Sequence, residues 1–141
     1  MRPASRRGFK LIELILAMAL MAVLLAIALP YYRKYQARSA LRLGASTLAA
    51  DLRYARGLAI KSGPATVDMR TSGRYDITDT NARKVRTQTL PDKVTIASGS
   101  TLVFAENGTA DRDVTISVNS SALNEALSIS VSKRTGQVSG P

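Results

Sequence analysis

The hydrophobic and polar positions form three successive patterns along the 141-residue chain. Residues 11–29 are apolar apart from one acid, residues 31–63 repeat apolar side chains at helical spacing, and apolar and polar positions alternate from residue 65 onward. The apolar run predicts a helix of roughly 28 Å, close to the hydrocarbon thickness of a bilayer. Together the patterns predict an α+β protein, in which one long N-terminal helix, half transmembrane and half amphipathic, packs on a small antiparallel β-sheet head.

The amphipathic segment carries one regular apolar stripe that should pack against the head. Its members recur at spacings of three and four residues: Leu41, Ala45, Leu48, Leu52, Ala55 and Ala59. Four arginines flank the stripe: Arg38, Arg42, Arg53 and Arg56. Three apolar residues lie on roughly the opposite side: Leu43, Tyr54 and Leu58. They indicate either a second face for a neighbouring subunit or one wide apolar face in a monomer, and Ser62-Gly63-Pro64 predicts the helix end.

The alternating region predicts short strands separated by frequent turns. Residues 65–69 and 74–78 form a hairpin around Thr71-Ser72-Gly73 in this interpretation. Further strands are expected at residues 84–90, 93–97, 101–105, 114–118 and 127–132. Such half-apolar strands favour an antiparallel sheet, one face of which the second half of the helix covers.

One acid, Glu13, interrupts the apolar run near its start. A charge within hydrocarbon costs about 2.5 to 3.5 kcal/mol on insertion scales, so an intramembrane acid is by default a functional residue with a partner. The sequence around it, Gly8-Phe9-Lys10-Leu11-Ile12-Glu13-Leu14, resembles the Gly-Phe-Thr-Leu-Ile-Glu-Leu signature of type IV prepilins and type II secretion pseudopilins.

The resemblance implies a role for each matched position. Gly8 would be the last residue of a leader that a prepilin peptidase removes, and Phe9 the new, methylated N-terminus. Glu13 would neutralise the amino group of a neighbouring subunit, and Pro30 would bend the helix. Lys10 departs from the family pattern, and it lies three residues before Glu13, where the two side chains can pair within one chain. Such a pair would weaken or modulate the pairing between subunits.

Residues 48–63 narrow the resemblance to GspH/FimT-type minor pilins and pseudopilins, in which a Leu, an Ala-Arg pair and an Ala-Ile step recur between stalk and head. Residues 101–108 and 128–138 resemble the closing strands of the same head. The family implies four parts: a leader at 1–8, a transmembrane and filament-core helix at 9–30, a stalk helix at 31–63 and a β-rich head at 64–141.

The function that the resemblance implies is that of a minor subunit in a filament, and it implies no enzyme activity. The filament would be a type II secretion pseudopilus, which exports proteins across the outer membrane, or a type IV pilus. The implied partners are other pilins, the prepilin peptidase, a platform protein, an assembly ATPase and inner-membrane lipid. The protein would cross the bacterial inner membrane once, with its head in the periplasm, before it joins a periplasmic pseudopilus or a surface pilus.

Two other interpretations of the N-terminus remain. Ala26-Ile27-Ala28 has the small-residue pattern of an ordinary signal peptidase site, which would release a soluble exported protein beginning at Leu29. Alternatively, the apolar run is a plain single-pass anchor. Neither interpretation explains an acid directly after Gly-Phe-x-Leu-Ile.

The net charge of +10 is concentrated outside the head. Residues 31–61 carry +6, from seven basic residues and one acidic, whereas residues 62–141 carry only +1, from nine basic and eight acidic. Arg33, Lys34 and Arg38 are therefore expected near anionic lipid headgroups. Lys133 and Arg134 suggest DNA or partner contacts, as in a DNA-uptake pilin. Three more basic residues of the head join them in the DNA hypothesis: Arg83, Lys84 and Arg86. The nearly neutral head and the lack of interleaved aromatic residues disfavour it.

The side-chain inventory offers little to catalysis or metal binding. The chain has no His and no Cys, so the commonest general base, the thiol nucleophile and the usual zinc ligands are absent, and we expect no cofactor. The acidic stretch from Glu106 to Asp113 contains oxygen ligands suited to calcium. It does not match a calcium loop, and turn chemistry explains Asn107-Gly108 and Asp111. No metal site is expected.

Overall fold

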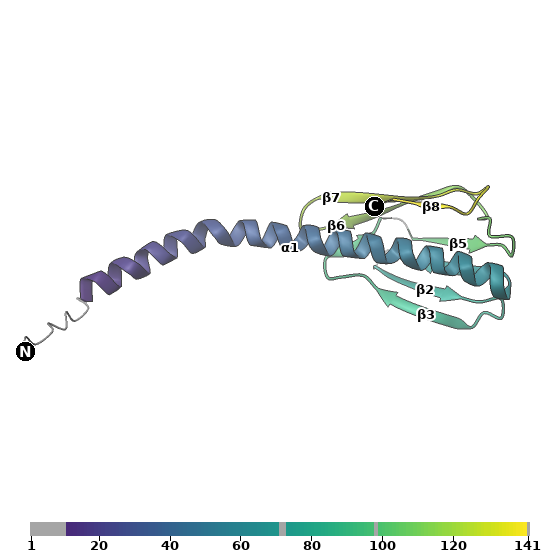
Figure 1. Ribbon diagram of the computed structural model, residues 1–141, viewed down its shortest axis with the longest axis horizontal. Coiled ribbons are helices and arrows are strands. Elements are labelled where there is room, and N and C mark those ends of the chain that lie inside the picture. The colour runs from purple at the N-terminus through teal and green to yellow at the C-terminus, as the bar shows by residue number, and fades with distance from the viewer. Residues whose placement is uncertain (1–10, 71–72, 98, 141) are drawn as a thin grey trace, which may run out of the picture. The chain divides into compact units, whose positions relative to one another are not determined.

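The computed structural model describes residues 11–70, 73–97 and 99–140 (Figure 1). Within these residues the chain forms one helix, α1 (Leu11–Ser62), followed by eight strands. The strands are β1 (Ala65–Met69), β2 (Arg74–Thr78), β3 (Lys84–Thr89), β4 (Val94–Ile96), β5 (Ser100–Phe104), β6 (Val114–Ser120), β7 (Glu125–Val131) and β8 (Val138–Ser139). The chain divides into two compact units, Met1–Tyr35 and Gln36–Pro141, which are described separately below.

The described part of the first unit is entirely helical. It contains the one segment, within the described residues, that is long and apolar enough to cross a membrane, with a mean hydropathy of 2.8 and no residue of that window buried. Pro30 lies inside α1, and the helix continues beyond it. Because proline has no N–H group, one backbone hydrogen bond of this turn is missing. The predicted bend at Pro30 stays a prediction.

The second unit buries the predicted stripe of α1. All six members of the stripe, from Leu41 to Ala59, are buried, which confirms that this face packs on the head. The helix ends as predicted at Ser62, because Gly63 adopts a φ of 92° and donates its N–H to the carbonyl of Ala59 at 3.1 Å. This is the left-handed cap that glycine favours.

The strands form two antiparallel sheets of four strands each. The order is β3-β2-β1-β5 in the first sheet and β4-β6-β7-β8 in the second. The predicted antiparallel head is confirmed, but its division into two sheets was not predicted. After β3 the chain turns at Pro91, whose carbonyl accepts from the N–H of Val94 at 3.1 Å, and β4 then pairs with β6 instead of β3. Alternation identifies the buried face of a strand but not its neighbour.

Strand bounds agree with the sequence pattern to different degrees. β1 and β2 have the predicted bounds, and their register pairs Thr66 with Thr78 and Met69 with Tyr75. β6 extends two residues further than predicted, and β8, with only two residues, was missed. Thr71 and Ser72 of the predicted turn lie outside the described residues, whereas Gly73 has a φ of 77° that suits a turn.

The core lies between α1 and the inner faces of both sheets, and Figure 1 shows the second half of α1 running along them. The largest fully buried side chains come from α1 and from strands of both sheets: Leu48, Leu52, Val67, Met69, Tyr75, Ile77, Ile96, Leu102, Phe104, Val118 and Ile129. Burying one such side chain stabilises the fold by about 1.5 to 3 kcal/mol. The second unit therefore has a hydrophobic core of its own.

Candidate functional site on helix α1

The first unit exposes a continuous apolar surface. Each large apolar side chain between Leu11 and Leu29 is 49 to 76% exposed. A helix that is apolar on all sides belongs in a core or a membrane, and an exposed apolar surface of this extent marks a site of contact with lipid or protein. The site is therefore a whole helical surface instead of a pocket.

Glu13 lies in the first turn of α1, at the edge of this apolar surface, and is exposed. Within the described residues, no hydrogen bond or ion pair of the structure involves the Glu13 carboxylate. Gly8, Phe9 and Lys10 lie outside the described residues, so their predicted roles stay predictions.

The outer face of α1 in the second unit is only partly as predicted. Leu43 and Tyr54 are 60 and 42% exposed, opposite the buried stripe. Leu58, which the pattern placed with them, is instead partly buried and packs against the core. Ile60, near the helix end, is exposed and was not predicted. Of the three residues predicted for a second apolar face, only Leu43 and Tyr54 are therefore exposed.

Three of the four arginines that flank the stripe attach α1 to the second sheet and the loops around it. Arg38 Nη2 donates to Glu125 Oε1 at 2.9 Å. Arg53 Nη2 donates to the carbonyl of Val138 at 3.3 Å, and Arg56 Nε to that of Gly108 at 3.0 Å. Arg38 therefore contacts a carboxylate of its own chain, and its expected contact with lipid headgroups stays a prediction.

The contact between Arg38 and Glu125 shifts both titrations in the direction expected of an ion pair. The hydrogen bond from Arg38 lowers the pKa of the Glu125 carboxyl, and the same bond raises the pKa of Arg38. Both side chains are about half exposed, so solvent screens most of their attraction. The pair orients the side chains but adds little stability.

Asp51 is a buried charge that the sequence analysis missed. It is 3% exposed on α1, and its carboxylate accepts hydrogen bonds from the Tyr75 hydroxyl at 2.8 Å and from the Arg86 guanidinium. The guanidinium carbon also lies 4.9 Å from the centre of the Tyr54 ring. Burial raises the pKa of the Tyr75 hydroxyl, and the bond to Asp51 raises it further. This cluster joins the helix to β2 and β3.

Helical position was the signal that could have revealed Asp51. It lies three residues after Leu48 and four before Ala55, at the edge of the predicted stripe, where a charged side chain must find a partner. Its partner Arg86 was considered for DNA phosphates. In the structure Arg86 pairs with a carboxylate of its own chain.

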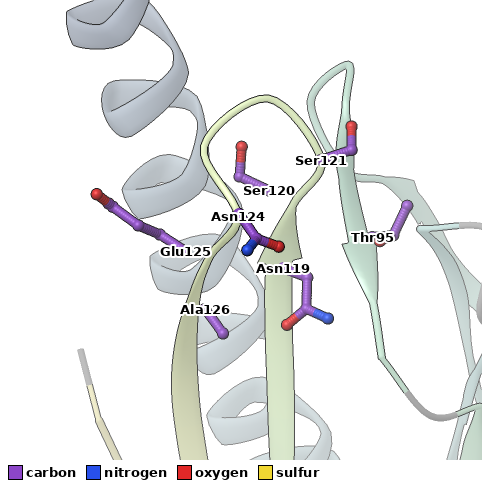
Figure 2. Close-up of a pocket in the computed structure, with 7 residues that line it drawn as sticks. All are labelled: Thr95, Asn119, Ser120, Ser121, Asn124, Glu125 and Ala126. Atoms are coloured by element: carbon purple, nitrogen blue, oxygen red, sulfur yellow. The ribbon is translucent and has the colours of Figure 1, made fainter.

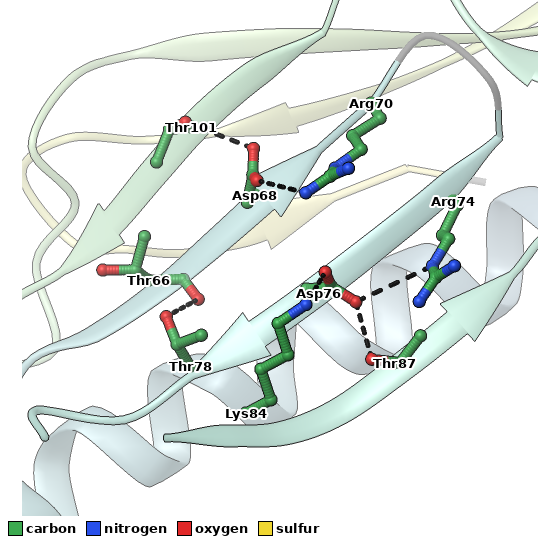
Figure 3. Close-up of polar contacts among 9 residues, drawn as sticks. All are labelled: Thr66, Asp68, Arg70, Arg74, Asp76, Thr78, Lys84, Thr87 and Thr101. Carbon is green, nitrogen blue, oxygen red and sulfur yellow. Dashed lines mark hydrogen bonds and ion pairs between the residues drawn. The ribbon is translucent and has the colours of Figure 1, made fainter. Parts of the chain in front are cut away.

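The outer face of the first sheet carries a second polar cluster (Figure 3). Asp76, which is 3% exposed, accepts from Lys84 Nζ at 2.9 Å and from Thr87 Oγ1 at 2.6 Å, and Arg74 Nε lies 4.0 Å away. The bonds from Thr87 and then Lys84 lower the pKa of Asp76. Lys84, a second residue considered for DNA, is therefore also paired within the chain.

Lys133 and Arg134 are exposed between β7 and β8 in the second sheet, whereas Arg83 directly precedes β3 and Lys84 and Arg86 lie on β3 in the first. The Lys133 N–H donates to the Asp113 carboxylate at 2.7 Å, which places an acid beside this turn. The fold thus assigns the basic residues of the DNA hypothesis to separate sheets.

A shallow hollow at the β6–β7 turn has a volume of about 380 Å³ (Figure 2). Hydroxyls, amides and one carboxylate line it: Thr95, Asn119, Ser120, Ser121, Asn124, Glu125 and Ala126. Glu125 already pairs with Arg38. These side chains include no activated nucleophile with an adjacent base.

The acidic loop after β5 follows turn chemistry. The Asn107 side-chain oxygen accepts from the N–H and hydroxyl of Thr109 at 3.1 and 2.7 Å, and Asp111 Oδ1 accepts from the Val103 N–H at 3.3 Å. Gly108 has a φ of 77°. Over the residues that the structure describes, no group of three or more acidic side chains gathers as a metal site.

An exposed apolar N-terminal helix with an acid near its start, joined to an antiparallel β head, defines the pilin-like class of prepilins. A family model described as "Prokaryotic N-terminal methylation motif" matches residues 3–29, and one described as "Type II transport protein GspH" matches residues 44–136. The chain belongs to the GspH family, and it is a minor pilin or pseudopilin subunit, as the resemblance predicted.

The fold is similar to the crystal structure of the type IV minor pilin FimU from Pseudomonas aeruginosa PAO1. The TM-score is 0.62 at 19% identity, over 76% of this chain and 92% of FimU. The GspH family is a structural pilin and pseudopilin family, whose members assemble into filaments with other pilins. The methylation motif and the apolar helix indicate a single-pass anchor in the inner membrane.

Proposed function

We propose that this subunit is stored in the inner membrane through its first helical segment and then built into a type II secretion pseudopilus. The observation that carries the proposal is the exposed apolar segment of α1 from Leu11 to Leu29, with Glu13 near its start. Such a surface is stable in lipid, and it is equally suited to a filament core made of like helices. The type II description of the family supports the secretion system.

The proposed processing divides the chain into four parts. The peptidase removes residues 1–8 after Gly8, and the new N-terminus at Phe9 is methylated. Residues 9–30 lie first in the membrane and later in the filament core, and residues 31–63 form the stalk. The head at 64–141 lies in the periplasm, and a platform protein and an assembly ATPase extract the subunit.

Glu13 is proposed to select the position of the incoming subunit. Its carboxylate pairs with the amino group at Phe9 of a neighbour, because two opposite charges buried together offset a desolvation that neither can bear alone. Pro30 supplies the bend between membrane segment and stalk, through its missing backbone N–H.

The head is proposed to act by contact and not by catalysis. Asp111 holds a turn and Asp76 forms an ion pair with Lys84, and the hollow at the β6–β7 turn lacks a nucleophile with a base. Lys133 and Arg134, both exposed, are proposed to contact a partner protein or cargo. Neutralising both residues should weaken that partner's binding and leave assembly intact.

The type IV pilus is the second candidate, because FimU shares the fold. Deletion of the gene separates the two systems. A secretion subunit predicts that exoproteins accumulate in the periplasm while twitching continues. A pilus subunit predicts lost twitching with normal secretion.

The test of the assembly role is Glu13→Gln, which keeps the shape of the side chain and removes its charge. We expect leader cleavage to continue, seen as an intact mass beginning at methylated Phe9, while incorporation into purified filaments drops at least tenfold. Glu106→Gln, at an exposed loop carboxylate, is the matched control and should assemble normally. Normal incorporation of the Glu13→Gln protein would refute the charge-pairing role, and a mature mass beginning at Leu29 would refute the prepilin processing.

A further inference from the structure

Tyrosine and cationic residues concentrate immediately after the apolar segment of α1. Three of the chain's five tyrosines lie within five residues, and Tyr31, Tyr32 and Tyr35 are 72, 59 and 72% exposed. Arg33 and Lys34 lie between them and are exposed as well. These five consecutive residues, 31–35, are called the tyrosine–cation belt below. The belt belongs to the first unit, and Glu13 is the only acidic residue of α1 within that unit.

Helical geometry distributes the belt around α1. At about 100° per residue, Tyr31 and Tyr35 lie roughly 40° apart, and Tyr32 lies roughly 60° beyond Tyr35. Lys34 lies roughly 60° to the other side of Tyr31, and Arg33 faces nearly the opposite side. Every side of this turn therefore presents an amphipathic ring or a cation. This composition is typical of the membrane–water interface, where rings lie at headgroup depth and cations reach lipid phosphates.

The length of the preceding segment places the belt at that depth. From Leu11 to Leu29 the helix extends roughly 28 Å, nearly the thickness of the hydrocarbon layer, and the belt begins two residues later. We propose that the tyrosine–cation belt binds the headgroups of anionic phospholipids and sets the depth of α1 in the membrane. The proposal rests on the membrane anchoring of the proposed function. Glu13 lies 18 residues before Tyr31, so the belt also determines how far Glu13 lies from the opposite surface.

Charge complementarity favours lipid phosphate over a second copy of the chain. Side-by-side copies would bring Arg33 and Lys34 of both chains together, and the belt contains no carboxylate to neutralise them. Like charges that are brought close together repel. Arg38, the next cation along α1, is bound to Glu125 and is not part of the belt.

Single tryptophans test the depth, because the chain contains no tryptophan of its own. The full-length Tyr35→Trp protein is reconstituted into vesicles of phosphatidylethanolamine and phosphatidylglycerol, with nitroxide lipids labelled near the headgroup or deep in the acyl chain. We expect the shallow label to quench Tyr35→Trp most strongly, and aqueous iodide to quench it weakly. Leu20→Trp, in the middle of the apolar segment, is the matched control and should respond to the deep label.

Each other outcome contradicts a specific step. If iodide quenches Tyr35→Trp as it does free tryptophan while the deep label quenches Leu20→Trp, that result refutes the binding of the belt to headgroups and supports the membrane anchoring of α1. If neither lipid labels nor iodide reach Tyr35→Trp, protein covers the belt and the lipid proposal is wrong. If the deep label does not reach Leu20→Trp, the membrane anchoring itself is wrong.

Lipid selectivity tests the cations. Headgroup-labelled phosphatidylglycerol should quench Tyr35→Trp more than equally labelled phosphatidylcholine, with a local enrichment of about fivefold for each cation. Adding Arg33→Gln and Lys34→Gln should abolish this difference and leave the depth of Leu20→Trp unchanged. Equal quenching by both lipids in the protein that retains Arg33 and Lys34 would overturn the proposed binding of anionic headgroups.

Discussion

The two halves of helix α1 satisfy their apolar residues in opposite ways. Between Leu11 and Leu29 every large apolar side chain is exposed, so this half depends on lipid or other subunits. Between Leu41 and Ala59 the apolar stripe is buried against sheets of the same chain. One half spreads apolar residues around the whole helix, and the other confines them mainly to one face. The same secondary structure thus serves assembly in one half and stability in the other.

The largest expected effect is a core truncation in the second half of α1. Leu52 is fully buried, so Leu52→Ala should lower the free energy of unfolding of the head by about 2 to 5 kcal/mol. Leu20→Ala, in the exposed half, should leave it unchanged. The measurement is urea unfolding of the full chain in detergent, followed by circular dichroism at β-sheet wavelengths. Equal losses in the two variants would contradict the division of labour between the halves.

Removing the buried carboxylate of Asp51 should have the next largest effect. Asp51→Ala leaves the fully buried Tyr75 hydroxyl without its acceptor, which should lower the unfolding free energy by about 1 to 3 kcal/mol. Tyr75→Phe should have a smaller effect, since Asp51 then still pairs with Arg86. The same urea unfolding measures both variants. The double variant should lose less than the sum of the single losses, and strict additivity would show that the bond contributes nothing.

Local patterns predicted the elements, whereas their pairing needed the structure. The period of the stripe identified the face of α1 that is buried, and alternation identified β1 and β2 with their bounds. Neither pattern records which strands become neighbours, so the separation of β4 from β3 was not predictable. β8 has only two residues, too few for a period.

The site shows the same limit of sequence information. The signature around Glu13 is local and was recognised from adjacent residues, and the family comparison supports it. The partners of Asp51 lie 24 and 35 residues further along the chain, on different strands. A bond between distant residues leaves no period in the sequence. For the same reason the pairing of Arg38 with Glu125, 87 residues away, appears only in the fold.

Replacing two glycines of α1 by alanine should give smaller changes in stability, with opposite signs. A Cβ at Gly44 would lie 3.1 Å from Val94 and 3.3 Å from Pro91, whereas one at Gly57 would meet nothing within 4 Å. Gly57→Ala should stabilise the helix by up to about 1 kcal/mol. Gly44→Ala should lose that gain and destabilise the head by roughly 1 kcal/mol, because the loop before β4 must move. Thermal unfolding of both proteins measures the difference. A matching gain at Gly44 would show that helix and loop are not in close contact.

The smallest expected effect is the pH dependence of stability that comes from Asp76. Its carboxylate is paired within its own chain, whereas the carboxylate of Glu13 is proposed to pair with a neighbouring subunit. The folded pKa of Asp76 lies below the ordinary value of 3.8, owing to the bonds from Thr87 and Lys84. Its stabilising effect is therefore complete above pH 3.8 and is lost as the pH falls through the lower folded pKa. Urea unfolding of the parent protein should show this decline, and Asp76→Asn should flatten it while remaining less stable at neutral pH. Lys84→Met should flatten it less, because the bond from Thr87, the largest single cause of the lowered pKa, remains. An unchanged acid slope in the Asp76→Asn protein would mean that other carboxylates control the acid stability of the head.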